Sequence, residues 1–205
     1  LMLGQIHLDQ GQTDEAFLMF EAAARSGDPR ALNMLGRAYE RGWGITRDPA
    51  TAALYYTHAA DHGYGWALFN LADLYLAGQG VRADPCRAHV LYVAAARAGV
   101  AKALNMLGIM AEQCMVPALL PASAPVFFHA AAMAGDCWGC VNLARLHLAA
   151  DQTDQAVPWL RKALEHGFGD VFAAIATLLA TRPDPLLRSV AHEATRRMMP
   201  RADDT

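Results

Sequence analysis

Apolar and small residues recur along this chain with a period of 36 residues. A leucine followed by glycine or alanine keeps this step at Leu35-Gly36, Leu71-Ala72, Leu107-Gly108 and Leu143-Ala144. A second series keeps the same step at Gly27, Gly63, Gly99 and Gly135. Small residues at a fixed place in such a period indicate stacked helical hairpins, because they let a neighbouring helix approach closely. The pattern therefore predicts an all-α solenoid of antiparallel helical hairpins.

Capping residues divide the second unit of this repeat into two helices. Asp28-Pro29 and Asp48-Pro49 each place an N-cap residue before a first-turn proline, which predicts two helix starts. Glycine adopts the left-handed conformation most easily, so we expect these helices to end near residues 42–44 and at Gly63. The third unit repeats the same signals 36 residues further on.

The outer units depart from this pattern. The first and fifth units are four residues shorter and lack the Gly-x-Gly loop, and the fourth replaces that loop with a proline-rich segment, residues 114–125. We expect a single repeat domain over residues 1–199, with units at about 1–27, 28–63, 64–99, 100–135 and 136–167, capping helices in 168–199 and a tail at 200–205. Tyrosines that recur in register, which we interpret as core or groove-edge aromatics, are Tyr39, Tyr56, Tyr75 and Tyr92.

In this register the chain resembles the Sel-one-like repeat family, a longer-looped relative of the tetratricopeptide repeat. The motif reads, in the third unit, Ala67, Leu71, Ala72, Tyr75, Gly78-Gln79-Gly80-Val81, Asp84, Ala88, Tyr92, Ala95-Ala96 and Gly99. The resemblance covers nearly the whole chain, although the first and fifth units look more like plain tetratricopeptide hairpins. It implies a right-handed α-solenoid that serves as an adaptor or scaffold for proteins or peptides, commonly in bacterial signalling, envelope or host-interaction systems.

A row of asparagines marks the place for a ligand if the first helix of each hairpin lines the concave face, as the resemblance implies. Its members are Asn33, Asn70, Asn105 and Asn142. An asparagine amide both donates and accepts, so such a row can hydrogen-bond the backbone of an extended peptide. Alternatively, the amides satisfy backbone groups between adjacent helices.

Charged and aromatic residues complete the predicted groove. The related tetratricopeptide carboxylate clamp combines asparagines with basic residues, which Arg37 and Arg145 could supply, whereas Asp73 stands at the intervening equivalent position and opposes an acidic ligand. Large aromatics near the starts of first helices either anchor a partner or fill hairpin junctions, and both interpretations stay open: they are Trp66, Phe69 and Trp138.

Composition limits the partners. With 54% hydrophobic residues and a net charge of -3, the 205-residue chain can bury a core but lacks the basic clusters that bind nucleic acid or anionic membranes. Residues 114–135 carry no Asp, Glu, Lys or Arg, but Pro117, Pro121 and Pro125 would interrupt a spanning helix, so we expect no membrane insertion. No signal peptide is visible, and since Leu3-Gly4 is already in register, we expect the chain to begin inside a larger protein. Localisation and oligomeric state stay open.

The sequence offers little for catalysis or metal binding. Cys137 and Cys140 form one C-x-x-C without a second, and His58 and His62 lie one helical turn apart, so we expect packing residues and a helix-end pair, with no metal and no cofactor. No serine stands in a nucleophile motif. We therefore predict a non-enzymatic interaction scaffold that binds a peptide or partner protein in its concave groove.

Two alternatives to that function are kept. The family resemblance also allows a hydrolase or ligand-binding protein acting on β-lactams or peptidoglycan. The repeat can instead be a spacer within a larger protein whose active part lies elsewhere.

Overall fold

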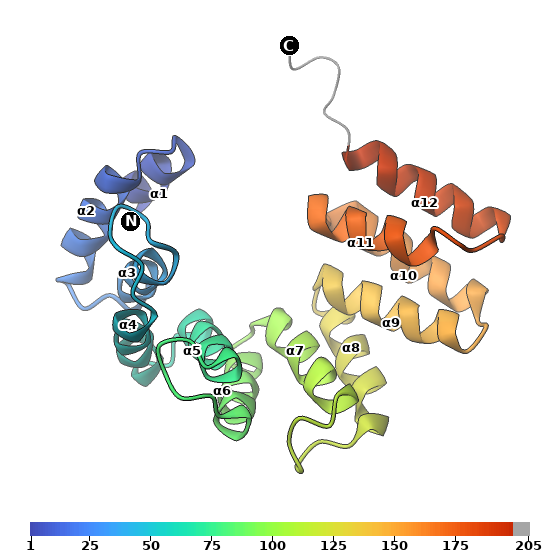
Figure 1. Cartoon of the computed structure of the whole chain (residues 1–205), viewed down its shortest axis with the longest axis horizontal. Coiled ribbons are helices and arrows are strands. Elements are labelled where there is room, and N and C mark those ends of the chain that lie inside the picture. The colour runs from blue at the N-terminus through green and yellow to red at the C-terminus, as the bar shows by residue number, and fades with distance from the viewer. Residues whose placement is uncertain (199–205) are drawn as a thin grey trace. The chain divides into compact units, whose positions relative to one another are not determined.

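The computed structural model describes residues 1–198, which form α-helices joined by short connections, without strands (Figure 1). The helices are α1 (Met2–Asp9), α2 (Thr13–Ala24), α3 (Pro29–Arg41), α4 (Pro49–Asp61), α5 (Gly65–Ala77), α6 (Pro85–Arg97), α7 (Ala101–Glu112), α8 (Ala124–Met133), α9 (Cys137–Ala149), α10 (Thr153–His166), α11 (Gly169–Leu179) and α12 (Pro185–Met198). The predicted all-α fold of helical hairpins is confirmed. The predicted tail at 200–205, and residue 199, lie outside the described residues.

The helices cluster into two compact units, of which the first is Leu1–Ala103 and the second begins at Leu104. In the first unit α1 to α6 pack in chain order, each on the next. The predicted helix starts are confirmed: the Asp28 carboxylate accepts from the Arg30 backbone N–H, and Asp48 accepts from the N–H groups of Ala50 and Thr51. The ends at Gly42 and Gly78 are left-handed, with φ of 76° and 66°.

In two repeats, the glycine that follows the recurring leucine is covered by an aromatic ring from the second helix of the same hairpin. A Cβ atom on Gly36 would lie 2.7 Å from Cε1 of Tyr56, and one on Gly108 would lie 2.5 Å from Cε1 of Phe128. Tyr56 and Phe128 are both fully buried. Glycine at these positions therefore permits the ring to lie directly against the first helix.

The second glycine of each Gly-x-Gly loop is required for contact between successive hairpins. Gly44 and Gly80 have φ of +65° and +69°, and a Cβ atom on either would overlap backbone of the preceding hairpin. For Gly44 that backbone is the start of α2 at Thr13 and Asp14, and for Gly80 it is the start of α4 at Pro49. The Gly-x-Gly loop of one hairpin therefore packs directly against the backbone of the hairpin before it.

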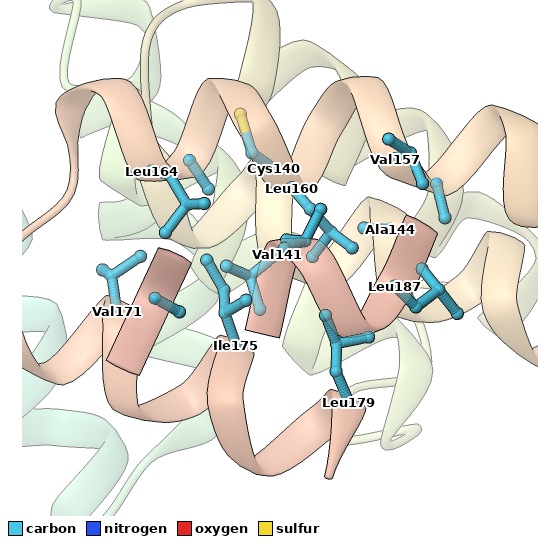
Figure 2. Packing of buried hydrophobic residues seen from close by; sticks show 14 of the residues in the cluster. Cys140, Val141, Ala144, Val157, Leu160, Leu164, Val171, Ile175, Leu179 and Leu187 are labelled. Atoms are coloured by element: carbon cyan, nitrogen blue, oxygen red, sulfur yellow. The ribbon is translucent and has the colours of Figure 1, made fainter. Parts of the chain in front are cut away.

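The second unit has a continuous core built from α9, α10, α11 and α12 (Figure 2). Val141 from α9, Leu160 from α10, Ile175 from α11 and Leu187 from α12 meet within it. The helix α12 packs against both α10 and α11.

The proline-rich segment predicted as a loop is partly buried. Its residues Val116 and Leu119 are buried, a single 3₁₀ turn forms at Pro121–Ser123, and Pro125 lies in the first turn of α8. A proline is tolerated there because the first-turn N–H groups have no partner within the helix.

We predict that Gly80→Ala destabilises the chain by about 2 to 4 kcal/mol, because alanine must adopt the left-handed conformation and also displace the Pro49 backbone. Gly63→Ala is the matched control, since Gly63 has a similar φ of +74° but no atom within 4 Å of where its new methyl group would lie. It should cost only about 1 kcal/mol. Chemical denaturation followed by circular dichroism measures both; equal losses would show that the hairpin contact at Gly80 contributes nothing.

Candidate functional site

A hollow in the first unit lies between α3 and α5 and has a volume of about 420 Å³. We call it the α3–α5 groove. Predicted site residues that line it are Asn33, Arg37, Trp66, Phe69, Asn70 and Asp73. The same hollow is also lined by Met34, Glu40, Arg41, Tyr64 and Lys102. The structure therefore brings the six predicted residues of the first unit to one place, and their role in binding stays a prediction.

The predicted asparagine row is divided into two hydrogen-bonded pairs. Asn70 Nδ2 donates to Asn33 Oδ1 at 2.9 Å, and Asn142 Nδ2 donates to Asn105 Oδ1 at 2.8 Å. Asn33 and Asn105 are only 5% and 4% exposed, whereas their donors are partly exposed. Each buried amide is thus paired with another amide on the next first helix rather than with the backbone. Asn70 remains the member that borders the groove with part of its surface open.

Two carboxylates that line the groove accept hydrogen bonds from tyrosines of the second helices. Tyr56 Oη on α4 donates to Glu40 Oε2 at 2.6 Å, and Tyr92 Oη on α6 donates to Asp73 Oδ1 at 2.5 Å. Both tyrosines are fully buried. Tyr56 and Tyr92 therefore belong to the core and also orient the groove's acidic groups. Tyr39 and Tyr75 are partly buried against a core cluster, so all four agree with their interpretation as core or groove-edge aromatics.

Burial changes the proton affinity of these groups. Desolvation is the main cause that raises the pKa of Asp73 to about 6, and the nearby Glu40 charge adds to it, while the Tyr92 hydrogen bond and the charges of Lys102 and Arg41 act in the opposite direction. Desolvation also raises the pKa values of Tyr56 and Tyr92. The tyrosines accordingly stay neutral donors, and Asp73 carries most of its charge only above about pH 6.

Three aromatic rings, those of Trp66, Phe69 and Tyr92, contact one another in series, and the last of them bonds Asp73. Trp66 and Phe69 meet edge to face with ring centroids 5.9 Å apart, and Phe69 lies 5.6 Å from the ring of Tyr92. Trp66 is 47% exposed, whereas Phe69 is 4% exposed and has Lys102 Nζ 5.6 Å from its ring. Of the two interpretations left open, Phe69 fits a junction residue, and Trp66 retains the exposed surface that a partner contact needs.

The remaining predicted residues lie in the second unit. Arg145 Nη2 binds Glu112 Oε2 at 2.6 Å, and Trp138 packs against the core cluster of this unit. Together with the Asn105–Asn142 pair, these residues are engaged within the protein. The sequence register placed them correctly on first helices, but they do not join the α3–α5 groove.

Residues missed by sequence reasoning are Glu40, Arg41, Tyr64, Met34 and Lys102. Glu40 stands seven residues after Asn33, two helical turns along the same face, so helical periodicity alone could have found it. Lys102 comes from the start of the next first helix, 33 residues after Phe69, the separation that also joins Glu112 and Arg145. The repeat register could therefore have placed the two positions side by side, although not the contact between their side chains.

The cysteine and histidine pairs show no feature of a reactive centre. Desolvation raises the pKa of Cys140 to about 11 and, to a smaller extent, that of Cys137, so the thiolate that redox or metal chemistry requires is disfavoured. His58 and His62 have ring centroids 5.4 Å apart, and His62 Nδ1 lies 2.9 Å from the His58 carbonyl oxygen. Within residues 1–198, no three His, Cys, Asp or Glu side chains are grouped as a metal site. None of the helices described is long and apolar enough to cross a bilayer.

The fold defines a helical-repeat protein of the α-solenoid class. The Sel1 repeat family matches residues 2–28, 29–64 and 67–100, and the tetratricopeptide repeat family matches residues 140–171. The chain thus contains Sel1 repeats followed by a tetratricopeptide repeat, which confirms the resemblance seen in the sequence. Repeats of this kind generally mediate contacts between proteins and are typically non-catalytic.

Solved structures agree with this assignment. One similar structure is a protective antigen of uropathogenic Escherichia coli strains that displays the Sel1-like repeat fold, with 28% identity and a TM-score of 0.71. The match covers 90% of this chain but only 41% of the antigen, so the chain spans about two fifths of that protein's length. A Sel1 repeat protein from Oxalobacter formigenes is 22% identical over 95% of this chain and 83% of its own, with a TM-score of 0.77. An immunity protein from Pseudomonas aeruginosa is 20% identical over 79% and 66%, with a TM-score of 0.58. No curated protein matches the sequence.

We predict that Asp73→Asn stabilises the chain above pH 6. Because the folded state raises the pKa of Asp73 above its ordinary value near 4, ionisation opposes folding as the pH rises from about 4 to about 6, and the penalty then stays constant. Asparagine keeps an oxygen for the Tyr92 hydroxyl and removes the buried charge. The variant should be more stable by about 2 to 3 kcal/mol at pH 8 and by about 1 kcal/mol at pH 4.5.

Denaturant titrations at the two pH values measure this difference, and the exposed Asp61→Asn on α4 is the control, which should match the wild type at both. A loss of stability in Asp73→Asn at pH 8 would mean that the Asp73 charge supports the fold.

Proposed function

We propose that this chain is a non-enzymatic scaffold that binds a peptide segment of a partner protein in the α3–α5 groove. The observation that supports this most directly is the meeting of Asn70, Asp73 and the half-exposed Trp66 around one hollow of about 420 Å³. A half-buried aromatic beside polar groups is the composition typical of protein-binding hot spots.

The polar groups of the groove suit an extended peptide. Asn70 can donate to and accept from a peptide backbone, while the groove also offers carboxylates and the cations of Arg37, Arg41 and Lys102. A mixed set of this kind selects for the pattern of charges in a ligand rather than for net charge alone. This favours a peptide with defined side chains over a uniformly acidic or basic partner.

The hydrolase alternative gains no support from this geometry. The ionisable side chains best placed in the groove, Glu40 and Asp73, are each held by a buried tyrosine, and the candidate thiols lie elsewhere with raised pKa values. A nucleophile needs an adjacent base or a lowered pKa. Binding is therefore the function that the residues fit best.

We predict that Trp66→Ala weakens binding of a groove peptide at least about tenfold, since removing a central aromatic anchor typically costs more than about 1.4 kcal/mol. Peptides are first selected from a random display library on the whole chain, and the affinity of fluorescently labelled members is then measured by anisotropy. The thermal midpoint should change little, because almost half of the Trp66 surface is already exposed.

Leu54→Ala is the matched control, because Leu54 is an exposed apolar side chain on α4 that does not line the groove. The two variants should differ clearly in peptide affinity. Selection of no peptide, or equal losses from both substitutions, would contradict binding in the α3–α5 groove.

A further inference from the structure

Equivalent positions of the first helices carry different charges in the two units. Positions 40 and 73 in the first unit correspond to positions 112 and 145 in the second, two repeats of 36 residues further on. The first pair is Glu40 and Asp73, and the second pair is Glu112 and Arg145. One unit therefore has two carboxylates where the other has a carboxylate and a guanidinium.

The second unit shows what these positions can hold. Arg145 Nη2 lies 2.6 Å from Glu112 Oε2, so the side chains at the two positions meet across adjacent first helices. The neighbouring asparagine pairs have nearly the same length in both units, 2.9 Å and 2.8 Å, which indicates the same helix register. A guanidinium that approaches Asp73 in the first unit is consequently also within reach of Glu40. The charge of Glu40 already affects Asp73, which agrees with their proximity.

Each tyrosine hydroxyl bonds only one oxygen of its carboxylate, so the other oxygen of Glu40 and of Asp73 can accept a hydrogen bond from a ligand. Tyr56 occupies Oε2 of Glu40 and Tyr92 occupies Oδ1 of Asp73. Glu40 Oε1 has Arg41 Nε at 3.5 Å, a long contact, and among the described residues Asp73 Oδ2 accepts no hydrogen bond. In the second unit Phe128 stands at the register of Tyr56 and has no hydroxyl, and Glu112 is bound by Arg145 instead. The position that holds Arg145 in the second unit therefore holds Asp73 in the first, and no arginine stands there to bind Glu40.

We propose that the α3–α5 groove binds an arginine side chain of a partner protein, with the guanidinium between the carboxylates of Glu40 and Asp73, in the manner of Arg145 against Glu112. The proposal rests on the peptide-binding function above and specifies its ligand. A planar guanidinium with five donors can bridge two carboxylates, which a single ammonium does less well. The exposed face of Trp66 can cover its methylene stem or stack on the guanidinium.

The cationic side chains that line the groove indicate which residues should flank the arginine in the partner's sequence. Arg37 lies 5.0 Å from the ring of Trp43, Lys102 lies 5.6 Å from the ring of Phe69, and Arg41 is largely exposed. None of them makes a short ion pair with Asp73 among the described contacts. These cations attract acidic residues, so the proposed ligand is an arginine flanked by Asp or Glu.

The test uses the peptides selected by display on the whole chain. We expect the Trp66-dependent peptides to share an arginine, and its replacement by citrulline, which has the same shape without the charge, to weaken binding at least about tenfold. Asp73→Arg should cause a similar loss, because the new guanidinium binds Glu40 as Arg145 binds Glu112. Asp61→Arg makes the same charge change outside the groove and should leave the affinity unchanged.

A second variant and a pH series keep the test independent of folding defects. Asp73→Asn retains the Tyr92 contact and should still lose about threefold to tenfold in affinity. For the wild type, affinity should fall about tenfold from pH 8 to pH 5, since Asp73 must be ionised to bind a cation and has a pKa of about 6. The charged and titratable groups around Asp73 are Glu40, Tyr92, Lys102, Arg41, Arg37 and Arg47. In Asp73→Asn this dependence should disappear.

The outcomes separate the two proposals. Peptides that need Trp66 but tolerate citrulline, or that bind Asp73→Arg as well as the wild type, overturn the arginine site and leave the peptide-binding function intact. An empty selection rejects both. Arginine-dependent, Asp73-dependent binding that weakens at low pH supports both.

Discussion

The close approach of an aromatic ring to a glycine on the facing helix underlies both the fold and the groove. Tyr56 can lie against α3 only because Gly36 has no side chain, and from that position its hydroxyl reaches Glu40. The ring supplies the packing between the two helices of a hairpin, and the hydroxyl at its far end fixes a carboxylate of the first helix that borders the groove. A single residue thus couples hairpin packing to the chemistry of the groove, so the packing of the core also determines where the charge is held.

The two units show how one repeat geometry supports different surfaces. In both, an asparagine pair joins adjacent first helices, and a carboxylate stands two turns further along. In the second unit phenylalanine replaces the tyrosine, and the carboxylate is neutralised by Arg145. In the first unit the hydroxyl is kept and Asp73 adds a second negative charge, which burial makes unfavourable. A strongly shifted pKa of a side chain in a cleft is typical of functional sites, where burial and neighbouring charges change proton affinity.

Some parts of the candidate site were accessible from sequence and others were not. Asn33, Asn70 and Asp73 follow from the repeat period, because residues in register occupy equivalent places on stacked hairpins. Glu40 follows from helical periodicity, because it stands two turns after Asn33 on the same face. The pairing of Asn70 with Asn33, in contrast, depends on side-chain rotamers on two helices, and the position of Lys102 over Phe69 depends on how a third helix meets them. Neither is encoded in a local pattern.

The repeat, the hairpin boundaries and the residues that face the same side could all be predicted from the sequence alone, because glycine conformation, N-caps and spacing act over one or two turns. Which of those side chains are exposed, and which contact other helices, depends on the tertiary packing. The asparagines pair with each other in both units, and Arg145 and Trp138 make contacts within the second. Trp66, Glu40 and Asp73 instead line an open hollow. Burial and charge pairing depend on neighbours from other helices, whereas the period of 36 residues specifies only where each residue stands on its own helix.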